Sequence, residues 1–337
     1  MAVVYHFNPG TGRRALCEAS VRECPLVHGS SPEEAMKNYE TLMNESNEVL
    51  AGVKKHRSAV KEIEEGFAQS SSSTSSSPRR MPLKALQADE LAKVLLVETS
   101  DLGMDVEKIH NSVQLATILH HGQTRGPRYH NGELKKKVPY IEHPLRNSLR
   151  LVRLGVKDQD IIIASVLHDT VEDGAQNYVN KFLNNKEEME ENEARKLLSA
   201  RIEQQYGQKV ASTVQAVTNE HTPLKQLGAL SMQERRNIYR DHVNENIRNN
   251  PAAYMVKISD FIDNATGLYH NDIAGSEKGI IKRALKYKPV VDVFRKRMDE
   301  MKLPVSKEDI QVIQGQLDRT EYRLSDLIEK YSHLVRN

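Results

Sequence analysis

Two pairs of ionisable residues follow the most hydrophobic stretch of the chain. His168 and Asp169 come directly after the apolar run IIIASVL, and Glu172 and Asp173 come one helical turn later. An imidazole and a carboxylate side by side can both bind one metal ion, and a second acidic pair can orient those ligands or handle protons. Without a metal, carboxylates this close would repel one another and shift one another's pKa values. The alternative is an amphipathic helix whose last turn is simply solvated.

A mononuclear metal site needs further ligands from elsewhere in the chain. His143 begins a helical pattern in VPYIEHPLRNSLRL, and Asp260 lies in AYMVKISDFIDNATG with Asn264 one turn on. With His168 and Asp169 they form a set of two histidines and two aspartates without a thiolate. Such ligands suit Mn, Fe, Mg or Zn. A centre of this kind activates water and neutralises phosphate oxygens, so the sequence predicts metal-assisted hydrolysis of a phosphate ester.

The elements that must position these residues are predicted to be helices. Apolar residues recur at helical spacing from Val106 to His120. The residues from Asp158 to Val171 are expected to form one buried helix, although seven apolar residues could also form a strand. No alternating strand pattern stands out. The chain of 337 residues is 38% hydrophobic and 5% aromatic without tryptophan, which favours a helical core of Leu, Val, Ile and Ala. The predicted fold class is all-α.

A serine tract from Gln69 to Pro82 divides the chain. Such a segment cannot bury apolar area and is typical of a flexible linker. The predicted organisation is a small N-terminal module over 1–66, a Ser-rich linker over 67–82, a main helical domain over 83–300 and a C-terminal helical extension over 301–337. In the N-terminal module, Ser31 is the expected N-cap of a helix that begins at Pro32, with Glu34 closing a capping box.

Composition limits the classes of partner. The 48 Lys and Arg residues nearly balance the 46 Asp and Glu residues, so no bulk charge predicts binding to nucleic acid or to an anionic membrane. No run reaches the roughly 20 apolar residues of a membrane span, and the first residues lack a secretory signal pattern. The 2 cysteines form no disulfide framework. We therefore expect a cytoplasmic protein.

Five sequence blocks resemble a known family. LHHGQTR, PYIEHPL, VLHDTVEDG, YGQKVASTVQAVT and VKISDFIDN occur in the order and approximate spacing of the (p)ppGpp hydrolase domain of RelA/SpoT homologues, an all-α metallohydrolase domain of the HD superfamily. The resemblance extends from about Asp105 to Met298. It implies a hydrolase that removes the 3′-pyrophosphate from guanosine tetra- or pentaphosphate, the alarmones of the stringent response, leaving GDP or GTP.

The resemblance also implies roles for single residues. The metal, Mn²⁺ with Fe, Mg or Zn as alternatives, would be held by four of them: His143, His168, Asp169 and Asp260. Glu172 and Asp173 would position or deprotonate the attacking water. In the nucleotide-binding part of the site, Arg125 would pack against the guanine and Asn264 would contact the nucleotide.

Three departures from the family pattern bear on the substrate. The insertion GPRYHNGELKKKV separates Arg125 from Pro139 and would lie near the substrate, where Arg128 could take over the base-stacking role. A solvated loop fits this insertion equally well. The usual DRxHN is DFIDN here, with Phe261 and Asp263 in place of Arg and His, so the supporting contacts must differ. The residues that follow the region of resemblance are too few for an alarmone synthetase domain, so none is expected.

Two other functions stay open. The chain could be an HD phosphohydrolase that acts on a different nucleotide. It could also be a non-catalytic nucleotide-binding or interaction protein, in which the N-terminal module and the final helix make the functional contacts.

The N-terminal module carries a second candidate metal site. Two cysteines and two histidines are a structural zinc combination, although their spacing is not that of a standard finger and the CxxC knuckle is missing. The four residues are His6, Cys17, Cys24 and His28. A plain reduced cysteine pair or a disulfide is the alternative. We expect the module to dock on a protein partner.

Overall fold

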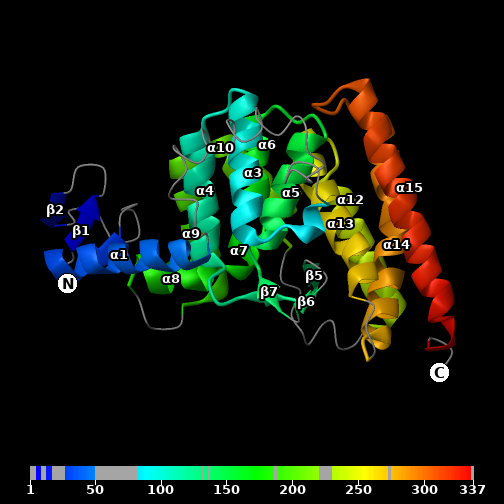
Figure 1. Cartoon of the computed structure of the whole chain (residues 1–337), viewed down its shortest axis with the longest axis horizontal. Helices are drawn as coiled ribbons and strands as arrows, with labels where there is room; N and C mark the ends of the chain where they lie inside the picture. Colours follow the sequence, from blue (N-terminus) through cyan, green and yellow to red (C-terminus); the bar gives the residue numbers. More distant parts are fainter. Residues whose placement is uncertain are drawn as a thin grey trace.

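The computed structural model describes residues 5–8, 13–16, 27–49, 82–126, 128–130, 133–135, 137–184, 189–219, 230–271 and 275–334. Within these ranges the chain is mostly helical, so the predicted all-α fold class is confirmed. The helices of the main domain form a bundle, and a smaller N-terminal module lies at one end of it (Figure 1).

The main domain begins with the 3-10 turn η3 (Leu83–Ala85), which leads into the first of its long helices. Its α-helices are α3 (Ala88–Asp101), α4 (Val106–Leu119), α5 (Glu142–Arg153), α6 (Gln159–Leu167), α7 (Thr170–Asp173), α8 (Ala175–Phe182), α9 (Glu191–Tyr206), α10 (Gln208–Val217), α12 (Met232–Asn246), α13 (Pro251–His270), α14 (Glu277–Glu300) and α15 (Lys307–Lys330), and the 3-10 turn η4 (Ser332–Leu334) follows. Among the described helices, none combines the length and the apolar character needed to cross a membrane.

Helices α5, α6 and α13 form the centre of the bundle and pack against one another. Every side chain of α6 from Ile161 to Leu167 is buried, which explains why this run is apolar on all sides. Asp158 caps the start of α6 by accepting a hydrogen bond from the backbone N–H of Asp160. The predicted single helix through Val171 is wrong in one respect, because α6 stops at Leu167 and α7 begins only at Thr170.

Helices α14 and α15 form a long hairpin against α13 (Figure 1). The helix α15 starts at a capping box in which the Ser306 hydroxyl accepts from the backbone N–H of Asp309 and the Asp309 carboxylate accepts from that of Ser306. Its apolar positions, which face the bundle, are Ile313, Leu317, Leu324 and Leu327. The C-terminal extension is therefore packed on the main domain, and the domain boundaries stay a prediction.

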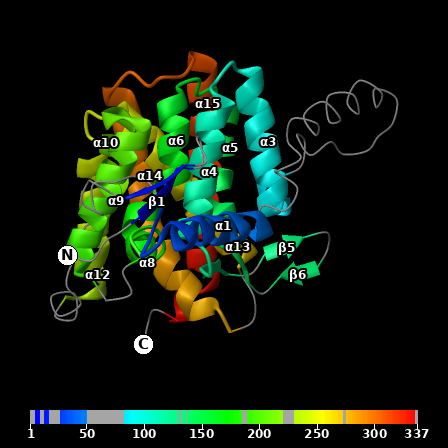
Figure 2. The same cartoon turned by 90° about the vertical axis from the view of Figure 1, so that its left-hand side faces the viewer.

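The N-terminal module is a three-stranded antiparallel sheet with α1 (Pro32–Val49) against it. Its strands, in the spatial order β2-β1-β3, are β1 (Tyr5–Asn8), β2 (Arg13–Leu16) and β3 (Val27–Gly29). Helix α1 begins at Pro32 as predicted, and the Ser31 hydroxyl accepts from the backbone N–H of Glu34 at 3.1 Å. The buried His28 places its Nδ1 atom 3.4 Å from the carbonyl oxygen of Phe182. Helix α1 contacts α4, which it crosses in Figure 2, so the module lies on the main domain.

The structure contains short strands, although the sequence shows no alternating strand pattern. The insertion forms two antiparallel ladders, in which β4 (Thr124–Arg125) pairs with β7 (Val138–Pro139) and β5 (Arg128–His130) pairs with β6 (Glu133–Lys135). Strands of two or three residues are too short to show an alternating pattern in the sequence. Strand β5 contacts η3, so the insertion is a paired extension beside the start of the main domain.

Several predictions fall outside the described residues. The serine tract before Pro82 is one of them, and the zinc candidates Cys17 and Cys24 are others. At His6 and Arg128 the backbone is described and the side chain is not. The linker, the zinc site and the stacking role of Arg128 therefore stay predictions.

Candidate metal centre and adjoining cavity

His143 lies in the first turn of α5 and is completely buried. Pro144 belongs to the same turn, where a missing backbone N–H costs no helical hydrogen bond. The Nε2 atom of His143 is 3.0 Å from Asp260 Oδ1, and its Nδ1 atom is 2.8 Å from Asp263 Oδ2. A carboxylate at Nδ1 favours the proton on that nitrogen. Nε2 is therefore the ring nitrogen that His143 can offer to a metal.

His168 and Asp169 occupy the interruption between α6 and α7. His168 is buried, and its Nδ1–H donates to the carbonyl oxygen of Ser165 at 2.8 Å. Its Nε2 atom lies 3.2 Å from Asp169 Oδ2 and 3.8 Å from Asp260 Oδ1, yet it forms no hydrogen bond within the described part of the chain. Burial alone would lower the pKa of His168, but Asp169 and Asp260 raise it to about 10, so a metal ion bound at this buried Nε2 atom would displace a proton that the two carboxylates favour there.

Asp169 and Asp260 complete the cluster. Asp169 Oδ2 is 3.6 Å from His143 Nε2, and the Asp260 carboxylate comes from the middle of α13. Burial alone would raise the pKa of both carboxyl groups, but His168 beside Asp169 and Lys257 beside Asp260 outweigh it. Both carboxyl pKa values are held below their usual range, so both groups are ionised and can donate to a cation.

The structure brings the four predicted ligands together. The ligand atoms of His143, His168 and Asp260 all lie within 4.8 Å of one another, and all three residues are buried. Asp169 adds a fourth ligand atom at the distances given above. Imidazole nitrogen and carboxylate oxygen form a donor set that suits Mn, Fe, Mg or Zn. The unbonded Nε2 of His168 shows that these residues fit a divalent metal.

Glu172 and Asp173 lie in α7, and each is held by a residue that the sequence did not indicate. Asn219 donates to Glu172 Oε2 from its backbone N–H at 3.0 Å and from its side-chain Nδ2 at 2.9 Å. The Tyr140 hydroxyl lies 3.0 Å from Asp173 Oδ2 and 2.8 Å from Asp169 Oδ2. Burial raises the pKa of both acids, and the charge of Asp169 adds to that rise. Both are therefore better proton acceptors than exposed carboxylates.

Asp263 stands where the family pattern has histidine, and it is the centre of a buried ionic network. Arg146 donates to it from Nε and from Nη2, both at 3.0 Å. Arg150 donates from Nη2 at 3.0 Å, and Lys84 donates from Nζ at 3.1 Å. Burial would raise the pKa of Asp263, but these cations hold it well below its usual range. The group formed by Asp263, Lys84, Arg146 and Arg150, the Asp263 cluster below, supports His143 through its Nδ1 atom.

The sequence spacing within α5 and within α13 places some members of this network on one face of each helix. Arg146 and Arg150 are four residues apart on α5, and Asp263 lies three residues after Asp260 on α13. The second departure, Phe261, belongs to the core, where its ring centroid lies 5.0 Å from that of Phe294. The two departures thus make one supporting contact, from Asp263 to His143, and one packing contact, from Phe261 to Phe294.

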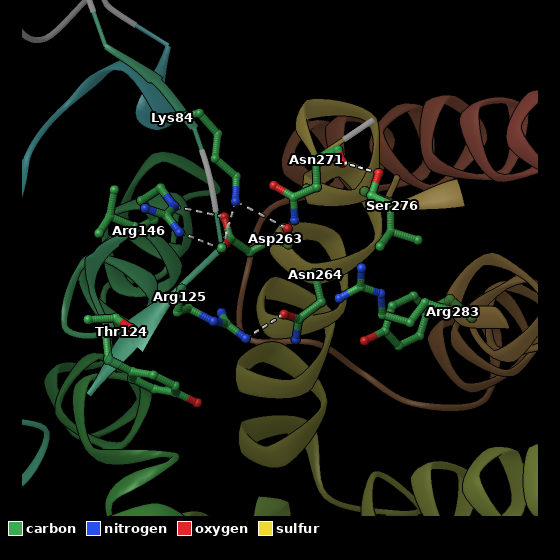
Figure 3. A pocket seen from close by; sticks show the side chains of 15 residues that line it. Lys84, Thr124, Arg125, Arg146, Asp263, Asn264, Asn271, Ser276 and Arg283 are labelled. Carbon is green, nitrogen blue, oxygen red and sulfur yellow. Dashed lines mark hydrogen bonds and ion pairs between the residues drawn. The ribbon is translucent and has the colours of Figure 1, made fainter. Parts of the chain in front are cut away.

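Figure 3 shows a cavity of about 310 Å³. It adjoins the metal-ligand cluster through Tyr140, which contacts Asp169, and through Asn264, which contacts Asp260. On its wall, Arg125 Nη2 donates to Asn264 Oδ1 at 2.9 Å. Asn264 Nδ2 in turn donates to Asp260 Oδ1 at 2.6 Å. The Arg125 guanidinium also lies over the ring of Tyr140, 5.0 Å from its centroid. The two residues predicted to contact the nucleotide are therefore linked to each other and to a candidate metal ligand.

A comparison with known proteins finds a hydrolase that is similar to part of the chain. A curated protein from Aquifex aeolicus (strain VF5), named guanosine-3′,5′-bis(diphosphate) 3′-pyrophosphohydrolase, is 32% identical to the chain over 148 residues. The match covers 41% of this chain and 16% of that protein, so the chain spans a minor part of the relative's length. No family model matches the chain. The match supports a distant relationship to hydrolases of this type.

Proposed function

We propose that this chain is a metal-dependent phosphohydrolase that removes the 3′-pyrophosphate from guanosine 3′,5′-bis(diphosphate) or the corresponding pentaphosphate. The observation that carries the proposal is the buried convergence of His143, His168 and Asp260, with Asp169 beside them. The substrate comes from the name of the Aquifex relative and from the five sequence blocks. Mn²⁺ is the proposed metal, with Fe, Mg or Zn as alternatives, and the cytoplasm is the proposed location.

The four ligands would hold the ion, which when bound would neutralise phosphate oxygens and make a nearby water more acidic. Asp173 is the proposed proton acceptor. The Tyr140 hydroxyl has one hydrogen but lies against carboxylate oxygens of both Asp169 and Asp173. Burial and the nearby charge of Asp169 raise the pKa of Asp173, which favours proton acceptance by this carboxylate. Asp173 would thus take a proton from the attacking water, and that proton can pass to the 3′ oxygen of the nucleotide as its bond to phosphorus breaks.

Glu172 and the nucleotide-facing residues would position the reactants. Both carboxylate oxygens of Glu172 accept hydrogen bonds from Asn219, which leaves Glu172 better suited to orient the water than to remove its proton. Arg125 offers a flat guanidinium for stacking on a base. Asn264 lies between Arg125 and Asp260, so it can couple the position of the nucleotide to the metal site.

Turnover of guanosine tetraphosphate tests the proposal. We expect the purified full chain with Mn²⁺ to release GDP and pyrophosphate, and we expect His168→Ala to bind no metal and to lose turnover. His333→Ala, an exposed histidine in η4, is the matched control and should keep wild-type activity. Absence of turnover with each of the four metals would contradict the proposal. A better substrate without a 3′ phosphate, found in a nucleotide panel, would favour the alternative nucleotide phosphohydrolase.

A further inference from the structure

The wall of the cavity beside the metal-ligand cluster is rich in positive charge. Four cationic side chains line it: Lys84, Arg125, Arg146 and Arg283. Among the described lining residues, Asp263 is the one carboxylate. Figure 3 shows Lys84 and Arg146 converging on Asp263, while Arg125 and Arg283 lie on either side of Asn264. The cavity therefore suits an anionic occupant better than a neutral one.

Within the Asp263 cluster, cations outnumber the carboxylates that they contact. Arg146 meets Glu142 at 3.3 Å in addition to Asp263, and the further hydrogen bonds of Arg150 go to neutral groups. Three positive charges, on Lys84, Arg146 and Arg150, thus face two negative charges. Burying an unmatched charge is unfavourable. An anion in the cavity would compensate it.

Lys84 is the member of the cluster best placed to reach such an anion. Its Nζ atom lies 3.1 Å from Asp263 Oδ2 and 3.4 Å from the carbonyl oxygen of Asp263, and the side chain keeps 22% of its surface exposed. An ammonium group has three N–H donors, so one of them remains for a ligand. Gly267 lies one turn after Asp263, and a Cβ there would come within 3.3 Å of Nζ. Because Gly267 has no side chain, the Lys84 ammonium group has room beside α13.

The charge of Lys84 is sensitive to what fills the cavity. Burial lowers the pKa of Lys84 to about 7, with Asp263 opposing this effect and the charge of Arg146 adding to it. An amine whose charge is disfavoured by burial gains more from a second anion than an exposed lysine does.

We propose that this cavity binds a second phosphate group of the substrate and that Lys84 is a specificity-determining residue that contacts it. This inference rests on the proposed function, in which the metal centre acts on the first phosphate group. A phosphate group has acceptor oxygens in several directions, which suits the Lys84 ammonium together with the forked guanidinium of Arg283. The site would then select nucleotides that are phosphorylated at two positions of the ribose over those phosphorylated at one.

A pair of non-hydrolysed ligands tests this selectivity. Guanosine 3′,5′-bisphosphate carries both phosphates and guanosine 3′-monophosphate carries one, and calorimetric titration of the full chain in a chelating buffer gives the ratio of their dissociation constants. We expect the wild-type protein to prefer the bisphosphate by about tenfold or more, the size of one charge-assisted hydrogen bond. Lys84→Met should bring the ratio close to one, and Lys84→Arg should keep most of the preference.

Two further variants separate binding from folding. Lys93→Met removes a lysine that is paired with Asp89 on α3 and lies outside the cavity lining, so it should keep the wild-type ratio. Arg283→Gln changes an exposed residue at the cavity and should lower the ratio without affecting the fold. If circular dichroism shows that Lys84→Met does not fold, an unchanged ratio in Arg283→Gln contradicts the proposal.

Other outcomes overturn the inference directly. Equal binding of the two nucleotides by the wild-type protein would do so, as would an unchanged preference in folded Lys84→Met. Binding of inorganic phosphate that depends on Lys84, without any preference between the two nucleotides, would assign the cavity to free phosphate instead. A Lys84-dependent preference without release of pyrophosphate from guanosine tetraphosphate would refute only the proposed hydrolase activity. Release of pyrophosphate without that preference would refute only the second-phosphate site.

Discussion

Replacing Asp263 by asparagine should weaken metal binding and destabilise the fold at the same time. Its Oδ2 atom accepts hydrogen bonds from His143 Nδ1, Arg146 Nη2 and Lys84 Nζ. Its Oδ1 atom accepts from Arg146 Nε and Arg150 Nη2. An asparagine has one carbonyl oxygen and one NH₂ group. Whichever way the amide is turned, its NH₂ group faces at least two N–H donors, and the negative charge is lost.

The size of both effects can be worked from these contacts. The Asp263 side chain is 1% exposed, and removing one partner of a buried ionic network costs about 3–5 kcal/mol. Since asparagine keeps one acceptor, we expect the lower end, about 3 kcal/mol of unfolding free energy. The lost orientation of His143 should reduce metal affinity by about 10- to 100-fold, which corresponds to about 1.4–2.8 kcal/mol.

Urea unfolding of the metal-free protein measures the first effect, and titration with Mn²⁺ measures the second. Asp292→Asn is the matched control, because that carboxylate is 81% exposed on α14. The control should stay within about 0.5 kcal/mol of the wild type and bind Mn²⁺ equally well. If folded Asp263→Asn binds Mn²⁺ with wild-type affinity, then His143 does not depend on Asp263 and the reasoning is refuted.

The other contacts of the site give kinetic and pH tests. Asn219→Ala removes the side-chain donor to Glu172 and leaves the backbone N–H, so kcat for pyrophosphate release should fall about tenfold with little change in KM, and an unchanged kcat would count against the orienting role of Asn219. Tyr140→Phe removes a hydrogen bond that lowers the pKa of Asp173, so the acidic limb of the pH–rate profile should move to higher pH. Lys84, with a pKa of about 7 within the Asp263 cluster, loses its charge as pH rises. Bisphosphate affinity should therefore fall between pH 7 and 9 in the wild type and stay flat in Lys84→Met, because the phosphate groups, with a second pKa of about 6, are already ionised there.

The helical fold and the candidate ligands could be predicted because their signals are local. His168 and Asp169 are neighbours in the chain, and they follow a run so apolar that it must be buried. His143 and Asp260 each belong to an apolar helical pattern that fixes their place on an inner face. Local spacing therefore indicates which residues are candidate metal ligands. The packing of α5, α6 and α13 brings their side chains together.

The supporting residues could not be predicted, because no local pattern connects them to the site. Asn219 and Glu172 are 47 residues apart, and Lys84 and Asp263 are 179 residues apart. Lys84 sits in a 3-10 turn of three residues, which is shorter than any periodic signal. The interruption of the helix at His168 has no local signal either, because the apolar run keeps a helical pattern up to Leu167.

The space at Gly267 makes Lys84 dependent on two positions of α13, 263 and 267. A side chain at 267 would press on the Lys84 ammonium, and a neutral residue at 263 would leave its three cations without their shared carboxylate. Among homologues, a lysine at 84, an aspartate at 263 and a glycine at 267 should therefore appear and disappear together. The short turn ahead of α3 would then co-vary with two positions of α13, and an alignment restricted to the candidate metal ligands and their flanking residues would omit Lys84.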